Sequence, residues 1–184
     1  NGSPYEIDKD DRRLEQVFAA RVKETGLPII FLNRIGGQDE LVFDGSSFVL
    51  NADGVAAHRL PDWEEHLRLT AWTRKGDSWT CAQGELSQWE DHPADIYSAM
   101  VLSLRDYVDR NRFPGVVLGL SGGIDSALCA AMEVDALGPE RVHCVMLPYA
   151  YTSKESLVDA EACAKLLGVR YDVVPIKEPV GEVA

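Results

Sequence analysis

Residues 115–137 read GVVLGLSGGIDSALCAAMEVDAL and predict a strand, a glycine turn and a helix in direct succession. The apolar residues between Val116 and Leu120 are typical of a buried parallel strand. The alanine-rich segment after Ser126 has apolar residues at helical spacing, and Gly138 followed by Pro139 predicts where that helix ends. The stretch therefore indicates one unit of an α/β sheet, with a polar turn at the carboxyl end of its strand.

The turn has the composition of an anion-binding site. Gly122 and Gly123 allow the backbone to approach an anion without a Cβ atom in the way. The first N–H groups of the following helix point out of its end without a partner. Ser121 and Ser126 add hydroxyl groups. The turn contains no lysine, so it does not match the GxxxxGK[ST] loop of other phosphate-binding proteins.

Asp125 gives this turn a carboxylate, which a polyphosphate alone would repel. The carboxylate is explained if Mg²⁺ lies between the two, because Mg²⁺ takes carboxylate and phosphate oxygens together. We therefore predict that Asp125 is a metal ligand and that Mg²⁺ accompanies ATP. An ordinary tight turn between strand and helix is the alternative, and the two serines and the aspartate favour phosphate binding over it.

The motif SGGIDS, residues 121–126, resembles the SGGxDS signature of the PP-loop ATP pyrophosphatases. This resemblance implies a Rossmann-like sheet and cleavage of ATP between its α- and β-phosphates. It also implies that a carbonyl-type oxygen is adenylated and that a nitrogen or sulfur nucleophile then displaces AMP. The implied ATP and pyrophosphate site consists of Gly119, Leu120, Ser121, Gly122, Gly123, Ile124, Asp125 and Ser126.

The elements that follow predict a β-α-β-α-β order. Residues 141–147 (RVHCVML) and 169–175 read as strands, with a helix between them that ends at Gly168. Thr152 and Glu155 form a predicted capping box at the start of that helix. Ligands bind beyond the carboxyl ends of such strands, where the glycine turn and the loop PYAYTS (residues 148–153) both lie. Met146, at the end of its strand, is a candidate adenine contact, with core packing as an equal alternative.

The first part of the chain predicts a helix followed by short strands. Gly36 and Gly37 are predicted to form a turn, and alternating apolar residues at 67–72 predict a further strand before a turn at Gly76 and Asp77. The four tryptophans all lie between residues 61 and 92. Their indole rings are expected to anchor this connector onto the domain surfaces or onto a subunit interface.

The segments NGSPYEIDK (residues 1–9), PIIFLNRIGG (28–37) and LVFDGSSFVLNADG (41–54) are similar to the C-terminal half of a nitrilase-type amidase domain. This resemblance implies an αββα sandwich that uses a Glu-Lys-Cys triad to release ammonia from glutamine. All three triad positions are expected upstream of Asn1, and Cys81 lacks the strand-to-turn context to replace the cysteine. The resemblance assigns Ser3 and Lys9 to glutamine binding, where the alternatives are a turn residue and a solvated charge.

Composition excludes some classes of function. The 184 residues carry a net charge of −12, which argues against a nucleic-acid-binding surface. No run is long and apolar enough to predict a membrane span. The four cysteines are widely spaced and include no CxxC pair, which indicates neither a zinc site nor a redox pair. Cys129, Cys144 and Cys163 lie in helix or strand patterns and are expected to be core residues in a reducing compartment. We expect a cytoplasmic protein.

Taken together, the two parts of the chain resemble the glutamine-dependent NAD⁺ synthetase family. This implies the C-terminal half of an αββα nitrilase-type sandwich at residues 1–60, a connector at 61–92, and the first part of a Rossmann-like doubly wound parallel sheet at 93–184. The implied reaction is the ATP-dependent amidation of deamido-NAD⁺ with ammonia from glutamine, in a homo-oligomer, and the chain is expected to be a fragment. Another PP-loop amide-forming ligase, or a non-catalytic nucleotide-binding fragment, remain alternatives.

Overall fold

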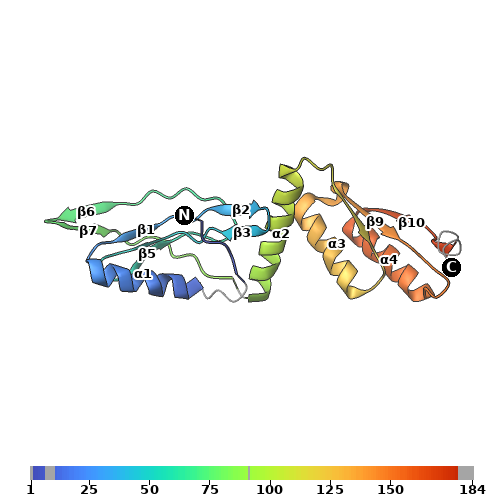
Figure 1. The fold of residues 1–184 in the computed structure, drawn as a ribbon, viewed down its shortest axis with the longest axis horizontal. Helices are drawn as coiled ribbons and strands as arrows, with labels where there is room; N and C mark the ends of the chain where they lie inside the picture. Colours follow the sequence, from blue (N-terminus) through green and yellow to red (C-terminus); the bar gives the residue numbers. More distant parts are fainter. Residues whose placement is uncertain (1, 7–10, 91, 178–184) are drawn as a thin grey trace. The chain divides into compact units, whose positions relative to one another are not determined.

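The structure is a computed structural model that describes residues 2–6, 11–90 and 92–177 (Figure 1). The chain divides into two compact units, Asn1–Ser103 and Leu104–Ala184. Helix α2 (His92–Arg110) begins in the first unit and ends in the second. The division into three segments at residues 60 and 92 stays a prediction.

The first unit combines one helix with short antiparallel strands. Helix α1 (Asp11–Thr25) is followed by β1 (Ile29–Phe31), β2 (Ile35–Gln38), β3 (Leu41–Asp44), β4 (Phe48–Leu50), β5 (Ala56–Arg59), β6 (Trp72–Lys75) and β7 (Ser78–Cys81). Three of these strands form an antiparallel sheet in the order β1-β4-β5. The pairs β2–β3 and β6–β7 each form a two-stranded ribbon.

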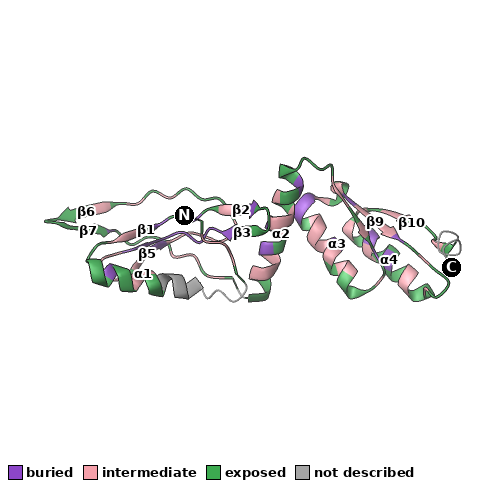
Figure 2. Ribbon diagram, viewed as in Figure 1, coloured by how far each residue is buried: buried purple, intermediate pink, exposed green. Residues whose placement is uncertain are grey.

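Strand β4 supplies both faces of the sheet, because successive side chains point to opposite sides. Phe48 and Leu50 pack with Phe31 of β1 and with Val22 of α1. Val49 points the other way and packs with Ala57, Cys81 and Trp72. Figure 2 shows this buried interior in purple and pink. Helix α1 therefore covers one face of the sheet with its apolar side.

The predicted turn at Gly36 and Gly37 is wrong, because both glycines belong to β2. They pair with Phe43 and Val42 of β3. The chain reverses at Asp39 and Glu40 instead, where Asp39 adopts a φ of 53°. Glycine pairs usually mark turns, and here the two buried glycines lie inside the ribbon, while an aspartate tolerates the left-handed conformation at the turn.

The predicted strand at residues 67–72 is also misplaced. Leu67 and Leu69 lie outside any strand and are 92% and 90% exposed. The strand begins at Trp72, and the expected turn at Gly76 and Asp77 joins β6 to β7. Alternation of apolar residues indicates a strand only where a partner strand is available, and no such partner pairs with residues 67–69 in the described part of the chain.

Three of the four tryptophans anchor residues 61–92 as expected. The indole N–H of Trp63 donates to Asp95 Oδ1 at 3.0 Å, and the ring of Trp63 lies edge-on to Tyr5. The guanidinium of Arg59 lies 4.3 Å from the ring centre of Trp89. Trp72 packs against the core, whereas Trp79 stays 43% exposed.

The second unit is a parallel sheet with two helices. It contains β8 (Val116–Gly119), α3 (Ile124–Leu137), the 3₁₀ turn η1 (Pro139–Arg141), β9 (Val142–Met146), α4 (Lys154–Leu167) and β10 (Arg170–Val173). The strand order is β10-β9-β8, with all pairs parallel. Alternate residues of β9 are buried against Ala130 of α3 and against Ala160 and Ala164 of α4. Small alanines at these positions let both helices approach the sheet closely.

The predicted capping box at Thr152 is wrong by one residue. The N-cap of α4 is Ser153, whose Oγ accepts a hydrogen bond from the N–H of Ser156 at 3.0 Å. The Thr152 hydroxyl instead accepts from the N–H of Tyr149 at 2.9 Å and closes the preceding loop. Both residues are good caps, and the loop geometry decides which one is used.

The predicted α/β class is confirmed, with an antiparallel α/β unit first and a parallel sheet with helical crossovers second. Helix α3 ends at Gly138 and α4 at Gly168, as the sequence indicated. Among the described residues, no helix has both the length and the apolarity needed to cross a bilayer.

Glu133 of α3 is a destabilising feature of the second unit. Its Oε2 atom is buried and has no hydrogen-bond partner among the described residues. Burial raises the pKa of this carboxyl above its ordinary value. Because the folded state holds the proton more tightly than the unfolded state does, ionised Glu133 lowers the free energy of unfolding.

We therefore expect Glu133→Gln to raise the melting temperature at pH 8 by a few degrees. The gain should shrink as the pH falls towards the carboxyl's ordinary pKa of 4.5, because Glu133 of the folded state is then protonated and the unfolded chain begins to bind the proton as well. Thermal unfolding, followed by circular dichroism at pH 8 and near pH 4.5, measures this gain in melting temperature. Glu40→Gln, at an exposed position, is the control. A gain of equal size at both pH values would contradict the explanation.

Candidate functional site

The glycine turn lies at the carboxyl end of β8, where the sheet holds it firmly. Leu120 follows the strand, is buried, and donates its N–H to the carbonyl of Val145 at 2.9 Å. This bond extends the β8–β9 pairing by one residue, so the turn starts from a fixed point. Residues 121–123 then lead into α3, whose N-cap is Gly123.

Two serine hydroxyls brace the turn from inside. Ser126 Oγ accepts from the N–H of Ser121 at 3.2 Å and donates to the carbonyl of Gly123 at 3.0 Å. The two hydroxyl oxygens lie 3.0 Å apart, and Ser121 Oγ accepts from the N–H of Gly123 at 3.3 Å. One arrangement of protons satisfies all four bonds, with Ser121 donating its hydroxyl proton to Ser126. The hydroxyl groups predicted to donate to an anion therefore shape the loop in this structure.

The N–H groups of Ser121 and Gly123 already bind serine hydroxyls, so the first N–H groups of α3 are the ones available to an anion. Gly123 gives no side-chain hydrogen bond to the start of α3. The first N–H groups of the helix, at Ile124 and Asp125, have no carbonyl one turn earlier to bind. Such N–H groups together with the helix dipole favour a negatively charged ligand at this position.

Gly122 holds the turn against the start of α4. It adopts a φ of 83°, and a Cβ atom added there would lie 2.3 Å from the carbonyl oxygen of Ser156. Such a distance is far inside van der Waals contact, so a residue with a side chain cannot occupy this position without moving one of the two segments. The turn and the first turn of α4 are thus in direct contact.

A cavity of about 470 Å³ opens between these two segments. One wall comes from the end of β8 and the turn, and the other walls come from the end of β9 and the start of α4. The lining residues are Gly119, Leu120, Ser121, Val145, Met146, Leu147, Tyr151, Thr152, Ser153 and Ser156. Its position beyond the carboxyl ends of the strands is where ligands bind in parallel sheets.

The predicted site residues divide into two groups around this cavity. Gly119, Leu120, Ser121 and Met146 line it. Gly122, Gly123, Ile124, Asp125 and Ser126 belong to the turn and the first turn of α3, beside the lining residues in sequence, but they are not part of the cavity wall. Met146 is buried, so its side chain serves the core as well as the cavity.

Individual residues of the PYAYTS loop were missed by the sequence reasoning, although the loop itself was placed at this edge. Tyr151 lines the cavity and is 92% exposed, with its ring centre 6.0 Å from that of Tyr149. Ser153 and Ser156 lie at the start of α4 with their hydroxyl oxygens 2.9 Å apart. An exposed aromatic side chain beside a cavity offers a flat surface for a ring to stack on.

Asp125 is exposed in the first turn of α3. No group of three or more potential ligand side chains that could hold a metal occurs among the residues that the structure describes. A single carboxylate still fits Mg²⁺, because this ion is usually held by one or two carboxylates together with substrate phosphates and water. Asp125 is therefore suited to share an ion with a polyphosphate and not to hold one alone.

The second predicted site lies in the first unit. Ser3 is half-buried, and its backbone is hydrogen-bonded to the side chain of Asn33. Lys9, the other predicted glutamine contact, lies outside the described residues.

Comparison with known proteins finds a family match in the second part of the chain and relatives that match nearly all of it. Residues 96–183 match the family model described as NAD synthase. The chain is 51% identical over 182 residues to a glutamine-dependent NAD(+) synthetase of Rhodobacter capsulatus, and 41% identical over 176 residues to that of Acinetobacter baylyi. These matches cover 97% and 96% of this chain but 32% of each relative, so the chain spans about a third of their length.

Solved structures show the same likeness. A glutamine-dependent NAD⁺ synthetase from Acinetobacter baumannii, in complex with adenosine diphosphate, superposes with a TM-score of 0.91 at 42% identity. This match covers 100% of this chain and 34% of that one. The enzyme of the same description from Cytophaga hutchinsonii has a TM-score of 0.74 at 17% identity, covering 99% and 36%, and shows likeness of fold alone.

Proposed function

We propose, from the match of residues 96–183 to the family model described as NAD synthase, that the protein amidates deamido-NAD⁺ to NAD⁺ at the expense of ATP. The nitrogen comes from glutamine, in line with the similarity of nearly the whole chain to glutamine-dependent relatives. The observation that carries the proposal is the braced glycine turn, which ends a parallel strand beside a cavity of about 470 Å³ within the matched segment. The relative solved with a bound adenine nucleotide supports nucleotide binding by the same fold.

In this proposal the turn binds the phosphates of ATP. The nicotinate carboxylate of deamido-NAD⁺ attacks the α-phosphorus, the bond to the β-phosphate oxygen breaks, and pyrophosphate leaves. The N–H groups at the start of α3, those of Ile124 and Asp125, would stabilise the charge that develops on the departing oxygens. Preorganised donors of this kind contribute about 3–4 kcal/mol each to lowering a barrier. Ammonia then attacks the adenylated carboxyl carbon and loses a proton to solvent. The bond from that carbon to the phosphate oxygen breaks, and AMP leaves with its electron pair.

The remaining residues have binding roles in this proposal. Asp125 would hold Mg²⁺, which spreads the negative charge of the phosphates. Tyr151 and Met146, which line the cavity, would contact the adenine ring. Ser3 and Lys9 would hold the α-amino-acid end of glutamine. A homo-oligomer in the cytoplasm is part of the same proposal.

The test is an assay of the full-length protein with Mg-ATP, deamido-NAD⁺ and either glutamine or ammonium. Formation of NAD⁺ and pyrophosphate with both nitrogen donors is the expected result. Formation of NAD⁺ with ammonium alone would reject the glutamine-dependent half of the proposal. Pyrophosphate exchange with a different carboxylic acid, and none with deamido-NAD⁺, would assign the chain to another amide-forming ligase.

Ser3→Ala provides a separate prediction for the glutamine site. We expect the KM for glutamine to rise about tenfold, which corresponds to the loss of one hydrogen bond to a charged group. The kcat with saturating ammonium should not change, because that reaction bypasses glutamine binding. Steady-state kinetics with each donor measures both quantities. Equal losses with both donors would instead indicate a general folding defect.

A further inference from the structure

The side chain of Asn33 grips the backbone of Ser3 from a segment 30 residues away. The N–H of Ser3 donates to Asn33 Oδ1 at 2.9 Å, and Asn33 Nδ2 donates to the carbonyl of Ser3 at 3.0 Å. Asn33 is only 7% exposed, so water competes little for these bonds. The two bonds together fix both the position and the rotation of the Ser3 backbone.

Asn33 is itself held in one orientation. Its Nδ2 also donates to Asp44 Oδ1 at 3.1 Å, and its backbone N–H donates to Ser47 Oγ at 3.0 Å. Asp44 and Ser47 are both buried. A carboxylate beside the amide can only accept, so Asp44 determines which end of the Asn33 amide carries the hydrogens. The amide oxygen is thereby directed to the N–H of Ser3.

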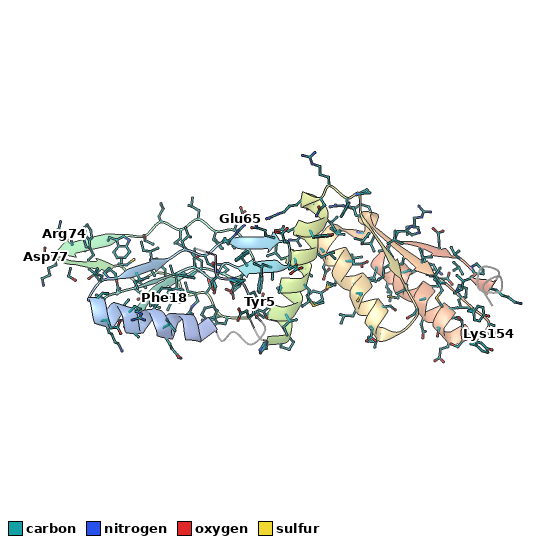
Figure 3. All side chains as sticks on the ribbon, viewed as in Figure 1. Tyr5, Phe18, Glu65, Arg74, Asp77 and Lys154 are labelled. Carbon is teal, nitrogen blue, oxygen red and sulfur yellow. The ribbon has the colours of Figure 1, made fainter. Side chains whose placement is uncertain are left out.

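The same loop is anchored again two residues later. The N–H of Tyr5, a residue labelled in Figure 3, donates to the carbonyl of Val42 at 2.8 Å. The centre of the Tyr5 ring lies 5.0 Å from that of Trp63. These contacts fix the path of the chain at Tyr5. The direction in which the Ser3 side chain leaves the loop depends on the backbone conformation at Ser3. The hydrogen bonds from the Asn33 side chain hold that conformation.

We propose that Asn33 is a positioning residue for glutamine, holding Ser3 in the conformation that receives the substrate. This inference rests on the proposed role of Ser3. A binding group that is already in place loses no conformational entropy when the ligand arrives. Loss of the two hydrogen bonds between Asn33 and the Ser3 backbone, here called the clamp, therefore weakens binding even though Ser3 remains. The carboxylate of Asp44 supports the clamp by orienting the Asn33 amide.

Asn51 provides a matched control in the same unit. Its Nδ2 donates to the carbonyl of Cys81 at 3.0 Å, and its Oδ1 accepts from the N–H of Cys81 at 2.7 Å. This is the same two-bond clamp across the same separation of 30 residues, and it is made to a residue with no proposed role in binding. Asn51→Ala therefore reports the cost of losing such a clamp for the fold alone.

The experiment compares Asn33→Ala and Asn51→Ala in the full-length protein, by thermal unfolding and by kinetics with glutamine and with ammonium. Asn33→Ala is expected to raise the KM for glutamine about tenfold and to leave the ammonium-dependent kcat unchanged. Asn51→Ala is expected to lower the melting temperature about as much as Asn33→Ala does. It should leave both the KM for glutamine and the ammonium-dependent kcat unchanged. A rise in the KM for glutamine in both variants, or in neither, overturns the inference.

Two further variants keep the test decisive if Asn33→Ala does not fold. Asn33→Asp removes the donor to Ser3 and places a second carboxylate beside Asp44, so the KM for glutamine should rise. Adding Asp44→Asn restores a donor between the two side chains and should recover part of the loss. No recovery in the double variant would overturn the role of Asp44 in the clamp.

Ser3→Ala, measured alongside, separates the two levels of proposal. If it raises the KM for glutamine and Asn33→Ala does not, the positioning role alone fails. If it leaves the KM for glutamine unchanged, the proposed function of Ser3 fails, and any effect at Asn33 must arise by another route, which also overturns the inference.

Discussion

Asp125→Ala is expected to lower the rate of pyrophosphate release from ATP at least about a hundredfold and to leave the fold intact. The magnitude is that of removing one preorganised stabilising group from a transition state. Asp125 is exposed in the first turn of α3, so its removal leaves no cavity. The loss should appear as a weaker dependence on Mg²⁺, because in the proposed role the variant would bind the metal through the phosphates alone.

Asp135→Ala is the matched control for this prediction. Asp135 is an exposed aspartate near the opposite end of the same helix, and the carbonyl that accepts from Arg105 belongs to its backbone and survives the change. Release of pyrophosphate is followed as a function of Mg²⁺ concentration in both variants. An Asp125→Ala protein with the native rate and the native Mg²⁺ dependence would rule out the metal-binding role.

Gly122→Ala is expected to have the second large effect, with at least about a hundredfold loss of pyrophosphate release and a lower melting temperature. The φ of 83° alone costs an alanine of the order of 1–3 kcal/mol. The new Cβ would also lie 2.3 Å from the carbonyl oxygen of Ser156. The turn would have to move away from α4, and the N–H groups that we propose bind the phosphates would move with it.

Gly168→Ala separates the effect of backbone strain from the effect of the clash with Ser156. Gly168 adopts a similar φ of 70°, and nothing lies within 4 Å of its added Cβ. This variant should lose stability through backbone strain and keep its activity with ATP. Melting temperatures and pyrophosphate release are measured for both variants. If the two behave alike, the contact with Ser156 has no role in the site.

Most elements of the second unit could be predicted because their signals are local. The strand at Val116, the helix after Ser126 and the two glycine ends at Gly138 and Gly168 each depend on residues within a few positions. Backbone propensity, apolar spacing and end-capping act over that range. The proposed roles of the eight turn residues, of Met146 and of Ser3 and Lys9 stay predictions.

Errors occurred where a local signal was outweighed by a distant partner. Gly36 and Gly37 look like a turn, and β3 recruits them into a ribbon. Thr152 and Ser153 are both acceptable caps, and the bond from Tyr149 occupies Thr152. Leu67 and Leu69 alternate like a strand but have no strand beside them in the described part of the chain.

The sequence by itself therefore determined the strand, the glycine turn and the helix around residues 121–126, because each of these follows from the chemistry of adjacent residues. Tertiary structure alone decided that the start of α4 forms the opposite wall of the cavity and that Gly122 touches Ser156. It also decided that Asn33 grips Ser3 across 30 residues. Contacts of this kind depend on how the sheets bring distant segments together, and no pattern of neighbouring residues encodes them.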